Sequence, residues 1–332
     1  MANLCPRSQE PTSAETKARL WPARALLPGL FFFLLILPFF IQNKVYILHL
    51  FSMTFMNIII VLGLIVILGY TKQFSLAQVA FYGIGAYTTA ILTAHHGVNF
   101  FLALGVSGVF AAFAAGLVAI PATRFQGPWL ALVTFAFAEI ARILMSRLRE
   151  ITGGFGGFFN IPKPALAGFV FHNDFRFYYI FYIVMVLVLI LTSRIRVSPY
   201  GRIWLSMGDN EELTSSLGIH LFYQKVLAFC VGSFFAGLAG SLYAAYASFI
   251  SPENFTVQHT IYYLTILIVG GLESISGGIA ATVIITLFSN YLRSLYPWDM
   301  VLFGLIIVLF VNLIPGGIGE KLEAIKKHFH VG

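Results

Sequence analysis

Charged side chains are scarce in this sequence. Of its 332 residues, 10% are Asp, Glu, Lys or Arg and 59% are hydrophobic types, whereas soluble domains are about 25% charged and about 45–50% apolar. A water-soluble fold of this length could not bury so much apolar surface. The composition therefore excludes an ordinary soluble enzyme, a disordered regulator and a fibrous protein, and it makes lipid the solvent for most of the chain.

Cysteine and the motifs of soluble catalysis are also nearly missing. Cys5 lies near the N-terminus and Cys230 inside a predicted membrane span, so no disulfide is expected. The sequence has no G-x-x-x-x-G-K-[ST], H-E-x-x-H or C-x-x-C pattern. The glycine run Thr152-Gly-Gly-Phe-Gly-Gly157 follows a membrane span rather than a strand, which does not fit a dinucleotide-binding loop. We expect no cofactor, no metal site and no enzymatic activity in this chain.

Long uncharged stretches are what the sequence has in their place. A helix needs roughly 20 apolar residues to cross the hydrocarbon core, and one stretch, 73–123, is long enough for two spans. A further segment, 125–146, is apolar except for Glu139 and Arg142. Because only helices satisfy all their backbone groups within one segment in lipid, we predict an all-α polytopic membrane bundle of about ten transmembrane helices. The uncharged stretches are 25–43, 45–71, 73–123, 177–193, 226–252, 254–272, 274–292 and 300–319.

Basic residues predict how the chain is oriented. The net charge of +7 does not indicate nucleic-acid binding, because no basic cluster is interleaved with aromatics on a soluble domain. Most Lys and Arg residues fall on one side of the membrane when the N-terminus is placed in the cytoplasm. We therefore predict cytoplasmic tails at 1–24 and 315–332 and a transmembrane domain over 25–314. Within that domain, 194–225 is a cytoplasmic loop and 147–176 an external loop.

Ten spans divide into five plus five, and an odd number per half gives the halves opposite orientation, as in many transporters. The third span of each half carries glycine interruptions, Gly83 and Gly85 in the first and Gly270 and Gly271 in the second. Such matched interruptions point to a substrate path, although glycine is common in any membrane helix. Small residues repeated every four positions, such as Gly232, Ala236 and Gly240, favour close helix packing instead.

Polar residues beside these interruptions are the candidates for a translocation pathway. They are Ser75, Gln78, Thr134, Ser274 and Ser276. Hydrogen bonding between helices is the alternative role for each of them.

Glu139 and Arg142 are the clearest ionisable residues within a predicted span, and they can pair because they lie three apart on a helix. The pair either anchors the outer end of its span or lines the outer vestibule, so Glu139 joins the pathway candidates.

The loop at 194–225 is the most informative segment. Pro199 and Gly201 break the chain, a short helix is predicted over Arg202–Leu217, and Gly218 lies just past its end. The middle of this helix is acidic rather than basic, which disfavours an anionic lipid surface and favours a protein partner. The polar residues concerned are Asp209, Asn210, Glu211 and Glu212.

Here the residues form an ordered set of motifs covering about residues 45–320. The set includes Phe74-Ser-Leu-Ala-Gln78, Gly85-Ala-Tyr87, Leu130-Ala-Leu-Val-Thr134, Thr152-Gly-Gly154, Ser198-Pro-Tyr-Gly-Arg202, Asp209-Asn-Glu211, Gly218-Ile219, Lys225-Val-Leu-Ala-Phe229, Ala236-Gly-Leu-Ala-Gly240, Ser251-Pro252, Gly270-Gly271 and Pro315-Gly-Gly-Ile-Gly319. In this order they resemble the permease subunits of ABC importers for branched-chain amino acids. The sequence departs from the family's pattern at Gly208, where Arg is usual, at Asp209 and at Glu273.

The resemblance implies a bacterial inner-membrane subunit that pairs with a second, similar permease, two cytoplasmic ATPases and a periplasmic binding protein, within membrane lipid. It implies that ATP-driven closure of the ATPases pushes on a coupling segment that comprises Gly201, Arg202, Asp209, Asn210, Glu211, Glu212 and Gly218. An ion-coupled carrier is the alternative and would need acidic residues at the bilayer midplane. A membrane scaffold or intramembrane enzyme is a third reading, without a visible catalytic set. Branched-chain amino acids, other amino acids, urea and short amides remain open as substrates.

Overall fold

The computed structural model describes residues 45–125, 127–166, 169–170 and 174–292, together with Pro38, Gly304 and 317–319. The predicted first span, 25–43, and the N-terminal tail lie outside these residues except for Pro38. The predicted last span, 300–319, and the C-terminal tail lie outside them except for Gly304 and 317–319.

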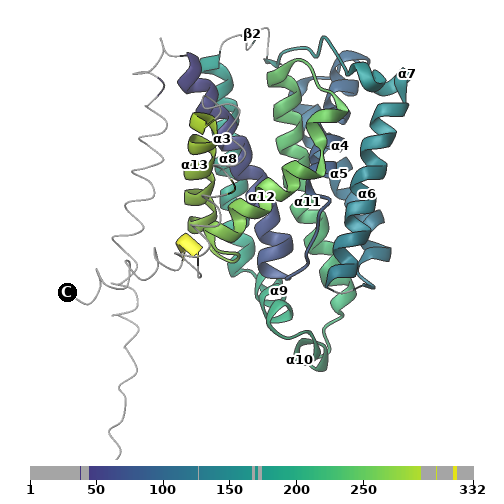
Figure 1. The fold of residues 1–332 in the computed structure, drawn as a ribbon, viewed down its shortest axis with the longest axis vertical. Coiled ribbons are helices and arrows are strands. Elements are labelled where there is room, and N and C mark those ends of the chain that lie inside the picture. The colour runs from purple at the N-terminus through teal and green to yellow at the C-terminus, as the bar shows by residue number, and fades with distance from the viewer. Residues whose placement is uncertain are drawn as a thin grey trace, which may run out of the picture.

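The described residues form a helical bundle, with one short two-stranded ladder, as predicted for an all-α membrane fold (Figure 1). Six of the helices are long and apolar enough to cross a membrane. The helices are α3 (Val45–Leu64) continued by the π-helix η1 (Ile65–Tyr70), α4 (Gln78–Ala94), α5 (Phe100–Ala122), α6 (Pro128–Arg147), α7 (Arg149–Thr152), α8 (Asp174–Val197), α9 (Pro199–Asp209), α10 (Glu211–Ser216), α11 (Leu221–Ala247), α12 (Val257–Gly270) and α13 (Ile275–Leu292), with 3₁₀ turns η2 (Gly154–Gly156) and η3 (Pro252–Phe255) and antiparallel strands β1 (Ala165–Leu166) and β2 (Phe169–Val170).

Two helices form the centre of the bundle. The span made of α3 and η1 is the most buried, and α11 packs against it, α4 and α5. The outer faces of α5, α6 and α8 instead expose large apolar side chains, which is the pattern of helices that face lipid. These exposed residues include Leu102, Val109, Phe113, Leu117, Leu132, Ile140, Ile143, Ile183 and Ile190.

Glycines allow the central helices to touch backbone to backbone. A methyl group added to Gly63 on α3 would overlap the carbonyl oxygen of Gly232 on α11, and one added to Gly240 would overlap the carbonyl oxygen of Tyr82 on α4. The small-residue repeat of α11 is therefore a packing device, as predicted. Because the backbones are in contact, α11 cannot move closer to α3 or α4 without displacing them.

Two helices, α4 and α12, have 17 and 14 residues, which lies at and below the short end of the roughly 17–25 residues that span a bilayer. The segment 71–77 leads into α4 without regular structure and is largely buried. Gln78, at the start of α4, donates from its side chain to the carbonyl oxygen of Ile60. Ile60 lies ten residues before the end of η1, which corresponds to about 15 Å along the helix axis. Val79 donates its backbone N–H to the Thr260 hydroxyl of α12 at 3.3 Å. The first turns of both short helices thus touch through the buried Thr260, whereas Gln258 and His259 at the start of α12 are exposed.

Candidate functional site

The α9–α10 segment, residues 198–220, lies between α8 and α11 and projects from one end of the bundle, with α7 and β2 at the other (Figure 1). It is shorter than the predicted loop at 194–225. Arg194 and Arg196 fall in the last turn of α8, where positive charge is favourable at a helix C-terminus, so they do not end the helix.

The segment folds as two helices rather than the single helix predicted over Arg202–Leu217. Ser198 caps α9 by accepting a hydrogen bond from the Gly201 N–H, and Pro199 occupies the first turn. Asn210 adopts extended backbone and its side-chain oxygen accepts from the Leu213 N–H at 2.9 Å, which starts α10. Gly201 lies inside α9 rather than at a break. Glycine suits this position because a side chain there would collide with the backbone of Ile195 and Arg196.

Most predicted coupling residues lie at the exposed surface of this segment. Arg202, Asp209, Asn210, Glu212 and Gly218 are exposed, whereas Gly201 is buried. Gly218 has a φ of +80°, which fits its predicted place just past a helix.

Apolar side chains are exposed at the same tip. Leu213 is 62% and Leu217 72% exposed, and neighbouring Tyr223 is 69% exposed. An acidic surface with protruding leucines has the composition of a docking surface rather than of a solvated loop.

The base of the segment is fixed to the bundle. Trp204 is buried, and its indole N–H donates to the Gln224 side-chain oxygen on α11 at 3.0 Å. Met207, three residues further along α9, is also buried. Gly208 lies against η1, and a Cβ atom built on it would lie 2.5 Å from the carbonyl oxygen of Tyr70. Gly208 therefore permits close contact between α9 and η1.

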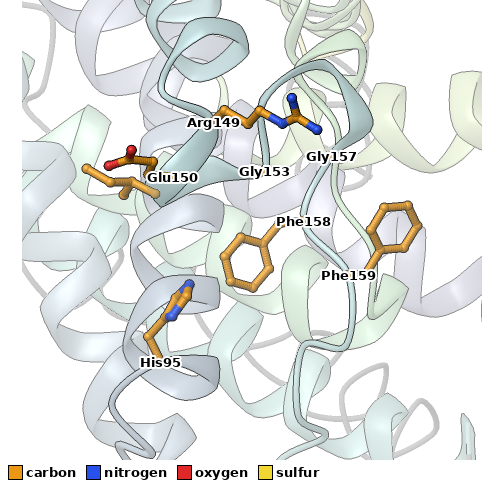
Figure 2. Close-up of a pocket in the computed structure, with 8 residues that line it drawn as sticks. His95, Arg149, Glu150, Gly153, Gly157, Phe158 and Phe159 are labelled. Carbon is orange, nitrogen blue, oxygen red and sulfur yellow. The ribbon is translucent and has the colours of Figure 1, made fainter.

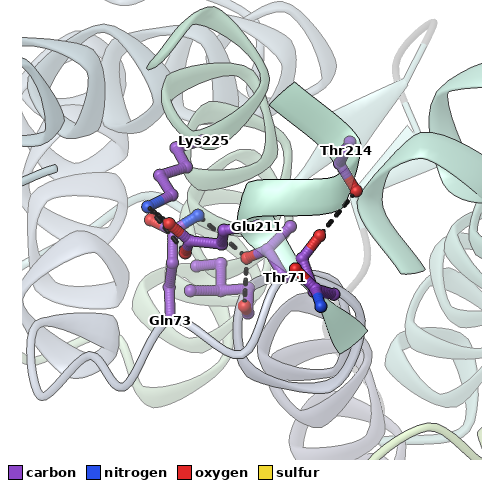
Figure 3. Close-up of polar contacts among 7 residues, drawn as sticks. Thr71, Gln73, Glu211, Thr214 and Lys225 are labelled. Atoms are coloured by element: carbon purple, nitrogen blue, oxygen red, sulfur yellow. Dashed lines mark hydrogen bonds and ion pairs between the residues drawn. The ribbon is translucent and has the colours of Figure 1, made fainter. Parts of the chain in front are cut away.

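An ion pair joins α10 to α11 (Figure 3). Lys225 Nζ lies 2.7 Å from one carboxylate oxygen of Glu211 and 2.8 Å from the other, and the Lys225 side chain is only 8% exposed. Gln73 lies beside the pair and donates to the Thr71 hydroxyl at 2.9 Å, while its own side-chain oxygen has no hydrogen-bond partner. Glu211 is thus turned toward the bundle, unlike its exposed neighbour Glu212.

The pathway candidates of the first half take structural roles in this conformation. Ser75 and Thr134 are buried and accept hydrogen bonds from the backbone N–H groups of Ala77 and Leu76. Gln78 is fully buried and donates toward the carbonyl oxygens of Ile60 and Gly232, at 3.5 and 3.3 Å. The structure brings these three residues together at the start of α4.

The remaining candidates lie apart from that group. Ser274 accepts from the Gly277 N–H at 3.1 Å and faces the Ser276 hydroxyl at 3.2 Å, so both serines belong to the start of α13. Gly270 packs against Gly277, and Gly271 adopts a φ of +97° in the same turn.

The last three candidates lie on α4 (Gly83 and Gly85) and on α6 (Glu139). Gly83 packs against Phe255 of η3, and Gly85 packs against the backbone of Gly237. The predicted pair on α6 is confirmed, with Arg142 and Glu139 joined at 3.0 Å and both partly exposed.

Sequence reasoning overlooked a polar network inside the bundle. Asn57 of α3 donates to the Thr286 hydroxyl of α13 at 3.1 Å and accepts from the Tyr263 hydroxyl of α12 at 3.1 Å. An asparagine in the middle of an apolar run was the available signal, because buried amides need partners. Lys225 was overlooked in the same way, since it was counted as a motif residue rather than as a buried charge.

Thr134→Val tests the role of the Thr134 hydroxyl. The substitution keeps the side-chain shape but removes the acceptor of the partly buried Leu76 N–H, which is expected to cost about 1–3 kcal/mol of stability. Thermal unfolding of the detergent-purified protein measures the loss. Thr265→Val is the matched control, because the Thr265 hydroxyl bonds only to Ile261 within its own helix. Equal melting temperatures for the two variants would contradict this role.

The opposite end of the molecule has a shallow pocket of about 260 Å³ (Figure 2). Its lining combines charged and aromatic side chains from the loop after α6 and from the end of α4. These residues are His95, Arg149, Glu150, Ile151, Gly153, Gly157, Phe158 and Phe159. The pocket lies in the segment predicted as the external loop, so the surface at this end is polar as well as apolar.

Comparison with known proteins matches the sequence of this chain to one family. The family "branched-chain amino acid transport system / permease component" matches residues 46–311. The chain belongs to this family of permeases. It is 33% identical over 290 residues, 80% of the chain and 68% of the relative, to the high-affinity branched-chain amino acid transport system permease protein LivM of Escherichia coli K12. The LivM protein of Salmonella typhimurium LT2 is 34% identical over the same shares of both chains.

A more distant relative extends the comparison to an archaeon. The probable branched-chain amino acid transport permease protein LivM of Methanocaldococcus jannaschii is 22% identical over 65% of the chain and 67% of that protein. No solved structure matches the chain. The family resemblance stated from the motifs is therefore confirmed, and as a permease with several membrane-spanning helices the chain is a multi-pass membrane protein.

Proposed function

We propose that this permease is the membrane-spanning subunit of an ATP-driven, binding-protein-dependent importer and forms part of the pathway for branched-chain amino acids. The observation that carries the proposal is the α9–α10 segment, which projects from one end of a family permease and exposes apolar and acidic residues. Such a surface suits a protein partner that supplies the energy. The partners are a second permease, two ATPases on the α9–α10 side and a binding protein on the side of α7.

In the proposed orientation, both termini and the α9–α10 segment lie in the cytoplasm of a bacterium, and the chain lies in the inner membrane. The full count is about ten spans in two inverted halves of five. The two central helices support this, because the α3 span and α11 are each second in their half, and the short helices α4 and α12 are each third. Matched short helices in two halves are the usual surroundings of a transporter pathway.

Reconstitution in liposomes tests the proposal. The permease is combined with a second permease, ATPases and a binding protein of the same importer, and uptake of radiolabelled leucine is measured. Uptake should require both internal ATP and the binding protein, and it should persist when ion gradients are dissipated. Uptake without ATPases, or loss of uptake with the ion gradient at constant ATP, would instead favour an ion-coupled carrier.

A further inference from the structure

The connection between α10 and α11 is poorly suited to carry force. Residues 217–220 form the link, and Leu217, Gly218 and His220 are exposed. A Cβ atom built on Gly218 meets no atom within 4 Å, so nothing packs on that position. A glycine at positive φ in an open link can rotate at low cost. Movement of the α9–α10 segment would be lost in this flexible link if the covalent chain were its only connection to α11.

Two side-chain contacts bridge this link. Trp204 of α9 bonds to Gln224, and Glu211 of α10 pairs with Lys225. The two α11 residues are consecutive and lie in its first turns, just beyond the link. The indole and the ammonium are both largely buried, so water and salt screen these contacts weakly.

The helix that receives these contacts is itself tightly held. Further along α11, Gly232 touches the backbone of α3 and Gly240 touches the backbone of α4. Interdigitated helices move as units rather than bend at such crossings. A displacement applied at the start of α11 therefore reaches α3 and α4.

We infer that Gln224 and Lys225 form a clasp that transmits movement of the α9–α10 segment to α11, bypassing the flexible link at Gly218. The inference rests on the proposed function. Both residues of α11 are positioning residues in this scheme, since each acts through its contact with the α9–α10 segment. Gln73 offers Lys225 an alternative partner, because its side-chain oxygen has no hydrogen-bond partner and Gln73 lies beside the ion pair. A carbonyl oxygen can accept a hydrogen bond from the Lys225 ammonium.

The test compares leucine transported per ATP hydrolysed in reconstituted complexes. Glu211→Gln and Lys225→Met each break the pair, and we expect transport per ATP to fall about fivefold while ATPase subunits still co-purify and hydrolysis stays within twofold. Exchange of the two charges, Glu211→Lys with Lys225→Glu, should restore at least half of the coupling. Glu273→Gln is the matched control, because it removes the more exposed Lys72–Glu273 pair at the same end and should change coupling less than twofold.

A second variant leaves every side chain of the clasp in place. Two glycines inserted between Ile219 and His220 lengthen the link, and transport per ATP should stay within twofold because the clasp carries the movement. Loss of coupling on insertion, or normal coupling in both single variants, would overturn the clasp. A wild-type complex that takes up leucine without ATP would overturn the proposed function instead, so the two failures are distinguishable.

Discussion

Replacing Leu213 and Leu217 together by aspartate is expected to reduce ATPase capture and ATP-driven leucine uptake by at least thirtyfold. Both side chains are mostly exposed on the α9–α10 segment, so the free permease loses no core contact. In the assembled importer, the same side chains would be desolvated in a partner groove, where a buried unpaired carboxylate is strongly unfavourable. Co-purification of the ATPases with the tagged permease pair, without the binding protein, measures the effect.

Leu148→Asp is the control for this prediction. Leu148 is 47% exposed at the opposite end of the bundle, between α6 and α7. The variant should capture the ATPases normally and melt at the same temperature as the Leu213/Leu217 variant. If the Leu213/Leu217 variant captures the ATPases as well as Leu148→Asp does, the α9–α10 tip is not the docking surface.

Gly240→Ala is expected to have the largest effect on folding. The added methyl group would overlap the backbone carbonyl of Tyr82, which cannot move away as a flexible side chain could. Overpacking of a close contact typically costs about 1–3 kcal/mol, and the upper part of that range corresponds to a melting temperature lower by about 3–4 °C for a chain of this length. Yield of folded protein in detergent and thermal unfolding measure the loss.

The chain supplies a matched glycine for comparison. Gly105 also lies within a membrane-span helix, α5, but a Cβ atom there meets nothing within 4 Å. Gly105→Ala should keep or slightly raise the melting temperature, since alanine is the better helix former. If Gly240→Ala and Gly105→Ala have the same melting temperature, the α4–α11 contact is looser than the glycine packing implies.

The sequence predicted the helical class, the six long apolar helices found between residues 45 and 292, and the Glu139–Arg142 pair, because long apolar runs and i, i+3 spacing are local signals. It also placed the surface residues of the α9–α10 segment. It did not predict the break at Asn210, since whether an asparagine continues or caps a helix depends on where the next helix must pack.

The pathway candidates show the limit of sequence reasoning more clearly. Ser75, Gln78 and Thr134 are polar residues beside a broken helix, and the same pattern describes a solute contact and a buried cap. Only tertiary neighbours separate the two roles, and in this structure they are backbone groups of Ala77, Gly232 and Leu76. Likewise, the inward turn of Glu211 follows from the position of Lys225 in space, which charge patterning alone does not give.

The adjacent starts of α4 and α12 have a consequence for the membrane potential. A helix N-terminus carries a partial positive charge equivalent to roughly half an elementary charge, and here the first turns of two helices touch. If the proposed pathway runs past these two ends, their combined field would oppose the passage of small cations there. A zwitterion has no net charge for that field to repel, so the same arrangement would leave the passage of an amino acid unopposed.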